Sequence, residues 1–353
     1  MDPDPTDSTD VQLRAGYVRP VRVDLSGVAG PTRDQARGPH WRQTSWGFHV
    51  PASVPTDDVG QRIVEASVVV PRGYAITGWA GLSWMGGRWF SGLSAAGDKL
   101  PITIVINSHD IRPQPRARIA VSGEGIDPRR VLWVDGVPVT DPRYSVSFEM
   151  RYARTDERAV VALDMAAYSD LVSIEEMAEF LAGQNGWTGV PRARRALALA
   201  DENCWSPPEA GMRQVWPTDL DRPRLLCNAP IFDLAGRHIG TPDVFDPVAG
   251  IAGEYDGEAH LDRDQRDRDL RREGEFRRHL IDVVTMTAPD RRDPTAFLRR
   301  VEAAYRHAHL RPPPGHRTWT TEKPSWWIPT ETVEQRRALT AEQRRRLLGH
   351  RLA

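Results

Sequence analysis

The chain is poor in cysteine and has no long apolar segment. Two cysteines, Cys204 and Cys227, occur in 353 residues. Two thiols are too few for a disulfide scaffold or a four-thiolate zinc site, so we expect reduced, half-buried thiols. No segment approaches the roughly 18 apolar residues of a membrane helix. The first ten residues hold four acids and no base, the opposite of a signal or transit peptide. These absences predict a soluble, cytoplasmic protein without a membrane partner.

The chain also lacks an excess of charge of one sign. Its 47 lysines and arginines nearly balance its 48 aspartates and glutamates. This balance excludes a protein that holds nucleic acid by bulk positive charge, but it leaves room for a local basic face. Only Lys99 and Lys323 are lysines. The excess of arginine suits phosphate recognition, because the guanidinium fork matches phosphate oxygens. A biased genome composition explains the same ratio more simply.

What is present is the composition of a folded chain of two or three domains, with 40% hydrophobic residues and 12 tryptophans. Residues 1–12 are expected to be a disordered acidic tail. Apolar spacing and turn residues then predict a hairpin at Trp41–Pro51, helices at Val59–Val69 and Ile76–Met85, a strand at Leu100–Ile106, a strand-turn-strand at Val131–Val139, and helices at Arg158–Ala167, after Ser173 and after Pro191. No catalytic constellation lies in this half, which indicates a scaffold or a recognition module.

The second half predicts an α-β-β-β-α-β order within an α+β fold. A helix is expected from Ser206 to about Trp216, because Ser206 and Glu209 have the spacing of a capping box. The other expected elements are strands at Leu225–Phe232, Arg237–Phe245 and Val248–Tyr255, a helix at Leu261–Arg278, a strand at Leu280–Met286, a helix at Thr295–Ala308, a break at Pro312–Pro314, and an Arg-rich helical tail at Thr340–Arg351.

Three carboxylates are expected near one another in this half. Asp243 lies near the end of the second strand and Glu254 near the end of the third, while Glu209 lies on the preceding helix. Converging carboxylates with a neighbouring backbone carbonyl form a hard-oxygen site suited to Mg²⁺ or Mn²⁺, which activates water and neutralises phosphodiester charge. Each residue also has a simpler interpretation: Glu209 caps its helix with Ser206, and Asp243 is a turn acid.

His260 follows these acids and precedes the expected long helix. It is a candidate for proton transfer or phosphate contact, or else an ordinary surface or capping histidine. The helix behind it alternates arginines with acids, which is typical of a solvated face with i,i+4 ion pairs. Arg266 and Arg272 are the two arginines that we single out as possible phosphate contacts.

Together these residues resemble a known nuclease family. Residues 191–290 resemble the very-short-patch-repair-like endonuclease domain of the PD-(D/E)xK superfamily, which is common at the C-terminus of actinobacterial proteins. The resemblance rests on Ser206–Glu209, Gly240–Asp243, Glu254–Gly257 with His260, and Asp269–Glu273 before a strand that ends at Thr285. It implies a restriction-endonuclease-like fold over 191–311, followed by a Pro/Trp linker and tail at 312–353.

The resemblance also assigns roles to residues. It implies metal binding by Asp243 and Glu254, with Glu209 as the helix acid and the Tyr255 carbonyl as a further ligand, and phosphate contacts by Arg266 and Arg272. Asp256 stands where the superfamily has the lysine of its ExK motif, and His260 would substitute for that lysine. The residues taken as catalytic are Asp243, Glu254, His260, Glu209 and Asp256.

The N-terminal half resembles, more weakly, abortive-infection type IV antitoxins and related transcriptional regulators. Residues 13–55 look like a degenerate winged-helix segment, and residues 56–190 like a mixed α/β middle region. The sequence thus leaves three hypotheses: a metal-dependent DNA endonuclease of repair or defence, a non-catalytic DNA-binding regulator with a relic nuclease domain, and a structural protein whose carboxylates bind nothing. The endonuclease hypothesis predicts that the Asp243 and Glu254 carboxylates lie within roughly 5 Å of each other, close enough to share a cation, and it fails if they point to opposite faces of the sheet.

Overall fold

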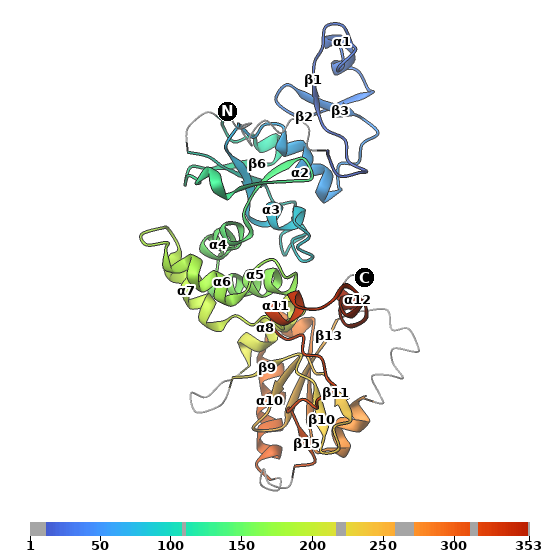
Figure 1. Cartoon of the computed structure of the whole chain (residues 1–353), viewed down its shortest axis with the longest axis vertical. Coiled ribbons are helices and arrows are strands. Elements are labelled where there is room, and N and C mark those ends of the chain that lie inside the picture. Colours follow the sequence, from blue (N-terminus) through green and yellow to red (C-terminus); the bar gives the residue numbers. More distant parts are fainter. Residues whose placement is uncertain (1–11, 108–110, 217–223, 258–271, 311–316, 352–353) are drawn as a thin grey trace. The chain divides into compact units, whose positions relative to one another are not determined.

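The computed structural model describes residues 12–107, 111–216, 224–257, 272–310 and 317–351 (Figure 1). The chain divides into two compact units. The N-terminal unit comprises Met1–Tyr152 and Phe180–Val190, and the C-terminal unit comprises Ala153–Glu179 and Pro191–Ala353. Both units contain helices and mixed or antiparallel sheets, which confirms a mixed α and β protein.

The N-terminal unit contains two sheets. A three-stranded antiparallel sheet has the order β1-β3-β2, and a five-stranded mixed sheet has the order β6-β5-β4-β8-β7. The elements are β1 (Val21–Arg22), α1 (Arg33–Arg37), β2 (Trp41–Ser45), β3 (Phe48–Pro51), α2 (Val59–Ser67), β4 (Ala75–Thr77), α3 (Gly78–Trp84), β5 (Ile102–Val105), η1 (Pro115–Ala117), β6 (Ile119–Ser122), η2 (Pro128–Arg130), β7 (Val131–Val134), β8 (Val137–Thr140) and α4 (Pro142–Tyr152). The predicted hairpin, strands and first helix of this half are confirmed.

The helix predicted at Ile76–Met85 is wrong at its start. Ala75–Thr77 forms β4, a fully buried strand paired with β5 and β8, and α3 begins only at Gly78. A short apolar run does not distinguish a buried strand from a helix by its spacing. Gly78 separates the two elements, because its φ of 64° lies in the left-handed region that glycine adopts without strain.

The C-terminal unit is built around a four-stranded sheet of order β14-β13-β12-β9. β13 and β14 are parallel, and the other pairs are antiparallel. The elements from α5 onward are α5 (Asp156–Tyr168), α6 (Ile174–Ala182), α7 (Val190–Leu199), α8 (Pro207–Val215), β9 (Leu226–Cys227), β10 (Ile231–Asp233), β11 (His238–Gly240), β12 (Val244–Asp246), β13 (Ile251–Asp256), β14 (Asp282–Thr287), η3 (Pro289–Arg291), α10 (Thr295–Ala308), β15 (Trp319–Thr320), α11 (Val333–Arg337), α12 (Ala341–Leu348) and η5 (Gly349–Arg351). Residues 272–278 are also helical, and the rest of the predicted long helix lies outside the described residues.

Two predicted strands are each divided between two sheets. The first becomes β9 and β10, and the second becomes β11 and β12, while β10, β11 and β15 form a small separate sheet. Asn228 ends β9 with a left-handed φ of 44°, a conformation that asparagine tolerates better than most residues. Pro242 precedes β12 and has no N–H to donate to a ladder. Strands are therefore present at Leu225–Phe232 and Arg237–Phe245 as predicted, but the prediction that each is continuous is wrong.

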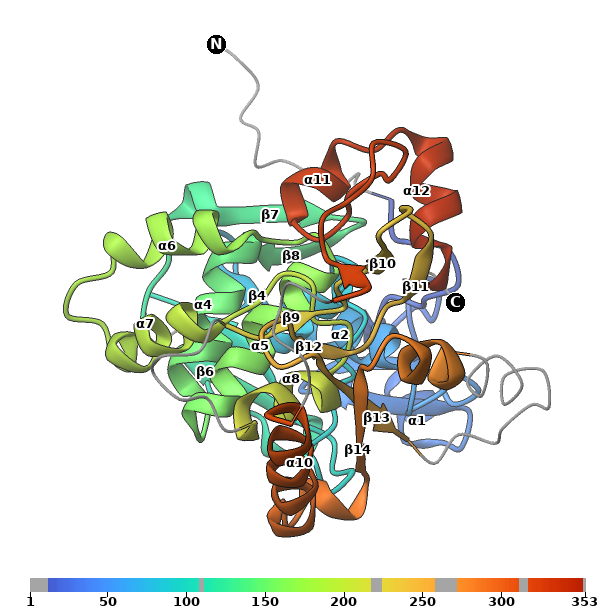
Figure 2. The ribbon, with the colours of Figure 1, turned by 90° about the horizontal axis from the view of Figure 1, so that it is seen from below.

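Helices α8 and α10 lie beside the four-stranded sheet (Figures 1 and 2). Each face of the sheet packs against a hydrophobic core. On one face, Met212 and Trp216 of the α8 segment and Phe297 of α10 pack against Val244 and Ile251. A Cβ on Gly253 would lie 2.7 Å from the Trp216 ring, so glycine is what allows this tryptophan to approach β13. The opposite face packs against the helical residues 272–278 and the small sheet, and its core members are Ile231, Ile239, Phe245, Ala252, Phe276, Ile281 and Trp319.

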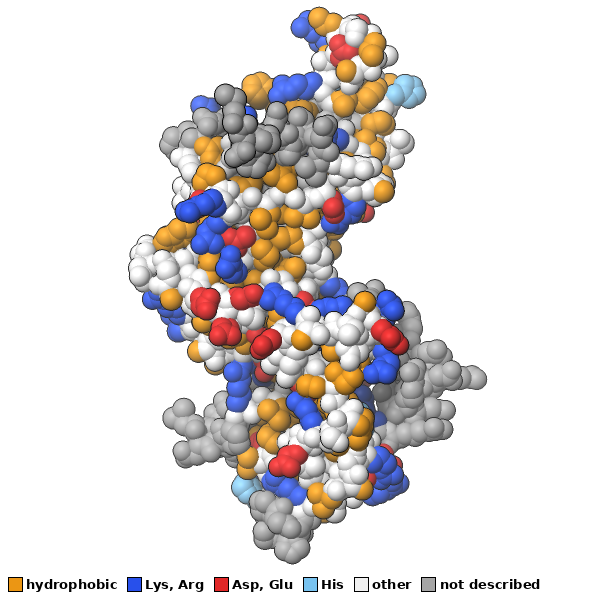
Figure 3. Space-filling model, in the orientation of Figure 1, with side chains coloured by type: hydrophobic (Ala, Val, Ile, Leu, Met, Phe, Trp, Pro, Cys, Tyr) orange, Lys and Arg blue, Asp and Glu red, His pale blue; other side chains and the backbone are white. Residues whose placement is uncertain are grey.

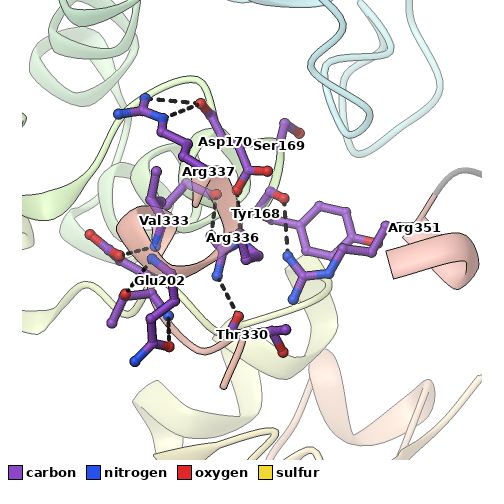
Figure 4. Close-up of polar contacts among 12 residues, drawn as sticks. Tyr168, Ser169, Asp170, Glu202, Thr330, Val333, Arg336, Arg337 and Arg351 are labelled. Atoms are coloured by element: carbon purple, nitrogen blue, oxygen red, sulfur yellow. Dashed lines mark hydrogen bonds and ion pairs between the residues drawn. The ribbon is translucent and has the colours of Figure 1, made fainter. Parts of the chain in front are cut away.

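The C-terminal tail packs back onto the C-terminal unit (Figure 4). Arg336 of α11 is fully buried and its Nε donates to Asp170 at 2.6 Å, beyond the end of α5. Its other nitrogens donate to backbone carbonyls, including that of Ala167 at 2.7 Å. Glu202 accepts from the N–H of Val333 at 2.6 Å and thereby holds the start of α11. We call Val333–Arg351 the tail clamp.

Cys204 and Cys227 are free thiols as predicted, but both are buried rather than half-buried. Acidic and basic side chains are interspersed over the face in Figure 3, in keeping with the balanced composition. Among the described helices, none is long and apolar enough to cross a membrane.

Candidate functional site

A row of polar residues crosses one end of the four-stranded sheet. Val244 pairs with Gly253 and with Cys227, so one further step of each register places Asp243 opposite both Glu254 and Asn228. The N–H of Asn228 donates to the Asp243 carbonyl at 3.0 Å, which continues the β9–β12 ladder by one residue. Directly opposed residues of an antiparallel pair share a face. Asp243 and Glu254 therefore lie on one face of the sheet, and the opposite-face arrangement that would exclude the endonuclease hypothesis does not occur.

The face is the one that packs against the helical residues 272–278. Phe245 and Ala252 belong to that core, and residues two apart along a strand point the same way. Glu254 also pairs with Thr285 of the parallel strand β14. The row thus reads Asn228, Asp243, Glu254 and Thr285 across all four strands.

Asp243 is fixed by the backbone of the neighbouring strand. Its Oδ2 accepts a hydrogen bond from the N–H of Tyr255 at 2.7 Å. Burial raises the pKa of Asp243, and the Tyr255 N–H and the Arg272 charge oppose that rise. This bond joins Asp243 to a strand 12 residues further along the chain and not to a local turn, and it fixes the direction of the carboxylate.

Ser206 caps α8 as predicted. Glu209 completes only half of the predicted capping box, since its carboxylate accepts from the Trp205 N–H and not from the Ser206 N–H. Its N–H donates to Ser206 Oγ at 3.4 Å, and the Ser206 hydroxyl donates to Glu209 Oε1 at 2.8 Å. Glu209 Oε2 accepts from the Trp205 N–H at 2.9 Å and from Asn228 Nδ2 at 2.8 Å. Burial and the neighbouring charge of Asp243 raise the pKa of Glu209 to about 7. Glu209 is thus a structural cap whose carboxylate also faces the candidate site.

Asn203 and Asn228 join the cap to the sheet, and the sequence analysis did not identify either of them. Asn203 Nδ2 donates to the Cys227 carbonyl at 2.8 Å and to the Asn228 carbonyl at 3.0 Å. Asn228 Nδ2 donates in return to the Asn203 carbonyl at 2.8 Å. The available signal was an asparagine inside an apolar predicted strand, where a side chain must find buried partners.

Arg272 supplies the positive charge of the site. Its guanidinium lies 3.2 Å from Glu254 Oε2, and Glu254 is 17% exposed. The lysines lie elsewhere: Lys323 pairs with Glu331 at 2.9 Å, and Lys99 belongs to the N-terminal unit. The other described arginines of this helix, Arg277 and Arg278, pair with Glu273 and Glu275, as the solvated-face interpretation predicted.

The other predicted site residues are Asp256, Tyr255, His260 and Arg266. Asp256 lies exposed at the end of β13. The Tyr255 ring lies 6.0 Å from the guanidinium carbon of Arg291. His260 and Arg266 lie outside the described residues, so their roles stay predictions.

A cavity of about 350 Å³ borders the site. Asn228 and Thr241 form part of its wall, and these residues lie next to Asp243 in the ladder and in the sequence. Three tryptophans, Trp205, Trp326 and Trp327, also line it, together with Arg346 of the tail clamp. The indole N–H of Trp327 is buried and has no hydrogen-bond partner among the described residues.

The donor set fits a hard divalent cation. Within the described part of the chain, no group of three or more His, Cys, Asp and Glu side chains is arranged around a metal position. Mg²⁺ keeps several waters and is commonly held by one or two carboxylates. Asp243 and Glu254, opposed on one face, supply two such carboxylates. Comparison of the chain with protein-family models, curated proteins and solved structures gives no match.

Proposed function

We propose that the C-terminal unit is a metal-dependent endonuclease domain that hydrolyses DNA phosphodiesters. The observation that carries this proposal is the opposition of Asp243 and Glu254 on one face of the sheet, next to the buried Glu209. The order α8, β9, β12, β13, helical residues 272–278, β14 supports it, because this is the α-β-β-β-α-β order of the restriction-endonuclease-like core that the sequence resembles.

Asp243 and Glu254 would hold Mg²⁺ or Mn²⁺, and the carbonyl of Tyr255 is a further candidate ligand. A cation bound there would polarise the phosphodiester and lower the pKa of a bound water. Tyr255 N–H orients the Asp243 carboxylate, and Asn228 links Asp243 to Glu209. Arg272 is the described cation at the site, so it is the group that would stabilise phosphate charge once a metal shares Glu254.

The neighbouring cavity supports a nucleic-acid substrate. Tryptophan faces stack on nucleobases irrespective of their sequence, and Arg346 provides a positive charge at the same wall. The cavity is large enough for a nucleotide by the usual range of ligand pockets, about 300–1,000 Å³. Its place beside Asn228 and Thr241 would hold a base next to the carboxylates.

The alternative is a DNA-binding regulator without catalysis. The ion pair of Arg272 with Glu254 and the hydrogen bond of Asp243 to Tyr255 N–H favour it, since both carboxylates already have protein partners. Asp256 at the position of the superfamily lysine favours it as well.

A plasmid-nicking assay with Mg²⁺ and with Mn²⁺ separates the two. We expect the full chain to nick DNA, and we expect D243N and E254Q to lose about 100-fold or more of the rate while retaining DNA binding. E275Q is the matched control, because Glu275 pairs with Arg278 on the adjacent helix. Calorimetric titration with Mn²⁺ should show binding to the wild type and E275Q but not to D243N. An inert wild type that binds DNA would favour the regulator.

A further inference from the structure

A basic cavity lies within the N-terminal unit. It has a volume of about 200 Å³ and opens between β2, α2, η1 and the first residues of β5 and β6. Its wall contains five cationic side chains and one acidic side chain among the described residues: Arg42, Arg62, Lys99, Arg116, Arg118 and Glu65.

Two of the cations are already neutralised. Arg42 donates to both oxygens of Glu65, at 2.7 and 3.1 Å, so this pair contributes little net charge. Lys99 pairs with the exposed Asp57 beside the cavity. Its hydrogen bond and charge hold the pKa of Asp57 below the usual value. Glu65 and Asp57 are therefore each paired with a cation, Arg42 and Lys99 respectively.

Three arginines remain in excess. Arg62, Arg116 and Arg118 have no carboxylate within ion-pair distance among the described residues. Burial lowers the pKa of Arg62, and the charge of Arg118 lowers it further. The charges of Glu65 and Asp57 oppose this lowering. The half-buried Arg62 and the exposed Arg118 therefore repel one another, and an anion between them would relieve this repulsion.

Two of these arginines, Arg62 and Arg118, make hydrogen bonds that hold them in place before any ligand arrives. Arg62 projects from α2, donates to the Leu100 carbonyl at 2.6 Å and lies 5.5 Å from the Trp79 ring centre. Arg118 donates to the Lys99 carbonyl at 2.7 Å and has a φ of 52°, a backbone conformation that is costly for a residue with a side chain. Groups fixed on rigid elements lose little entropy on binding.

We propose that this cavity, which we call the arginine pocket, binds a phosphate group. Guanidinium groups donate in parallel to phosphate oxygens, and three arginines in excess around about 200 Å³ match a small polyanion better than a neutral ligand. The phosphate belongs either to a small phosphorylated compound or to the backbone of a nucleic-acid strand. The inference rests on the N-terminal unit alone and is independent of the carboxylate site.

The first test is calorimetric titration of the full chain with pyrophosphate at constant ionic strength. We expect saturable binding of pyrophosphate to the wild type. The dissociation constant should rise about tenfold or more in R62Q and in R118Q, because each substitution removes a charged hydrogen-bond donor. R129Q is the matched control and should bind as the wild type does, since Arg129 is exposed and pairs with Asp127 outside the pocket. Circular dichroism checks the fold, and R116Q, at an exposed position, replaces R62Q if that variant is misfolded.

The second arm identifies the source of the phosphate. A labelled ten-nucleotide thymidine strand that loses affinity in R118Q and is displaced by pyrophosphate would assign the pocket to a nucleic-acid backbone. Unchanged binding of the strand with weakened binding of pyrophosphate would assign it to a small phosphorylated compound. Absence of saturable pyrophosphate binding, equal binding by R62Q and R118Q, or equal displacement by chloride would overturn the proposal.

Discussion

Glu209 makes hydrogen bonds that hold the start of α8, and its carboxylate also lies at the candidate site. The capping box predicted for it with Ser206 is confirmed in one of its two bonds, whereas its part in metal binding stays a prediction. Its carboxylate accepts from a backbone N–H, an amide and a hydroxyl while almost fully buried. A glutamine can satisfy the same three partners, because its amide offers both an acceptor and a donor.

Replacement of Glu209 therefore separates the two roles. We expect E209Q to unfold in urea at nearly the wild-type concentration, and E209A to lose about 1–3 kcal/mol because the Trp205 N–H and the Asn228 amide are left buried without an acceptor. If Glu209 assists the metal, E209Q also weakens Mn²⁺ binding. Equal stability of E209A and the wild type would contradict the structural role.

His49 gives a pH-dependent prediction. It is buried in β3, and burial lowers its pKa below the ordinary value of 6.5. The folded state thus prefers the neutral imidazole. Its contribution to stability is complete above pH 6.5 and is lost as the pH falls below that value. We expect H49F to unfold with a weaker dependence on pH between 6.5 and 4.5 than the wild type. H40Q, at an exposed histidine, serves as control, and a parallel loss in H49F and the wild type would refute the argument.

At the scale of elements, the tail clamp shows how an arginine-rich segment can be structural. Arg336 is buried against Asp170, whereas Arg337 on the same turn pairs with Glu176 at the surface. We expect R336M to lower the free energy of unfolding by about 1–3 kcal/mol, because it leaves the Ala167 carbonyl without its buried donor while Asp170 keeps its pair with Arg344. R337M should cost less than about 1 kcal/mol. Urea unfolding of both variants measures the difference in the free energy of unfolding. Equal decreases in R336M and R337M would show that burial of the Arg336–Asp170 pair does not set its contribution to stability.

The sequence predicted most elements that have a strong local signal. The helix α10 has the predicted ends at Thr295 and Ala308, and α8 begins after Ser206 as its capping box requires. The sequence could not predict that the first hairpin of this unit divides between two sheets, because the left-handed turn at Asn228 depends on partners distant in the chain. Local spacing contains no information about those partners.

The same limit applies to the candidate site. Asp243 and Glu254 were identified because a tight turn between two predicted strands brings residues of that spacing together, and their common face agrees with the register. Arg272 was expected at a phosphate but lies against Glu254. Asn228 was missed because its role follows from a hydrogen bond to Glu209, 19 residues away. Spacing predicts neighbours on adjacent strands, and it does not predict long-range hydrogen bonds.

For the molecule as a whole, the balance of charges has a structural explanation. Several arginines lie in the interior with acidic or carbonyl partners: Arg151, Arg213, Arg336 and Arg351. Arginine suits these positions because its several N–H donors can bond a carboxylate and backbone carbonyls at the same time, as those of Arg336 do. The high arginine content therefore is no measure of nucleic-acid binding in this chain, and the arginine pocket is identified by its unneutralised charge and not by residue counts.

Both units contain a fully buried arginine: Arg151 lies in the N-terminal unit and Arg336 in the C-terminal unit. Arg151 is fully buried in the N-terminal unit, where it donates to both oxygens of Glu124 at 2.6 and 2.8 Å and to the Thr188 carbonyl at 3.1 Å. It therefore ties the segment Phe180–Val190 to the main part of that unit. Units with separate cores are expected to unfold separately.

We expect R151M to increase hydrogen exchange in peptides of the N-terminal unit, including Phe180–Val190, and R336M to increase it in peptides of the C-terminal unit only. The doubly substituted chain should show the sum of the two effects, because distant sites that share no partner add within about 0.5 kcal/mol. Exchange measured by mass spectrometry on the full chain resolves the peptides. Faster exchange in β12 and β13 of R151M would show that the two cores unfold together. The boundaries at Tyr152 and Val190 would then separate two compact units that do not unfold independently.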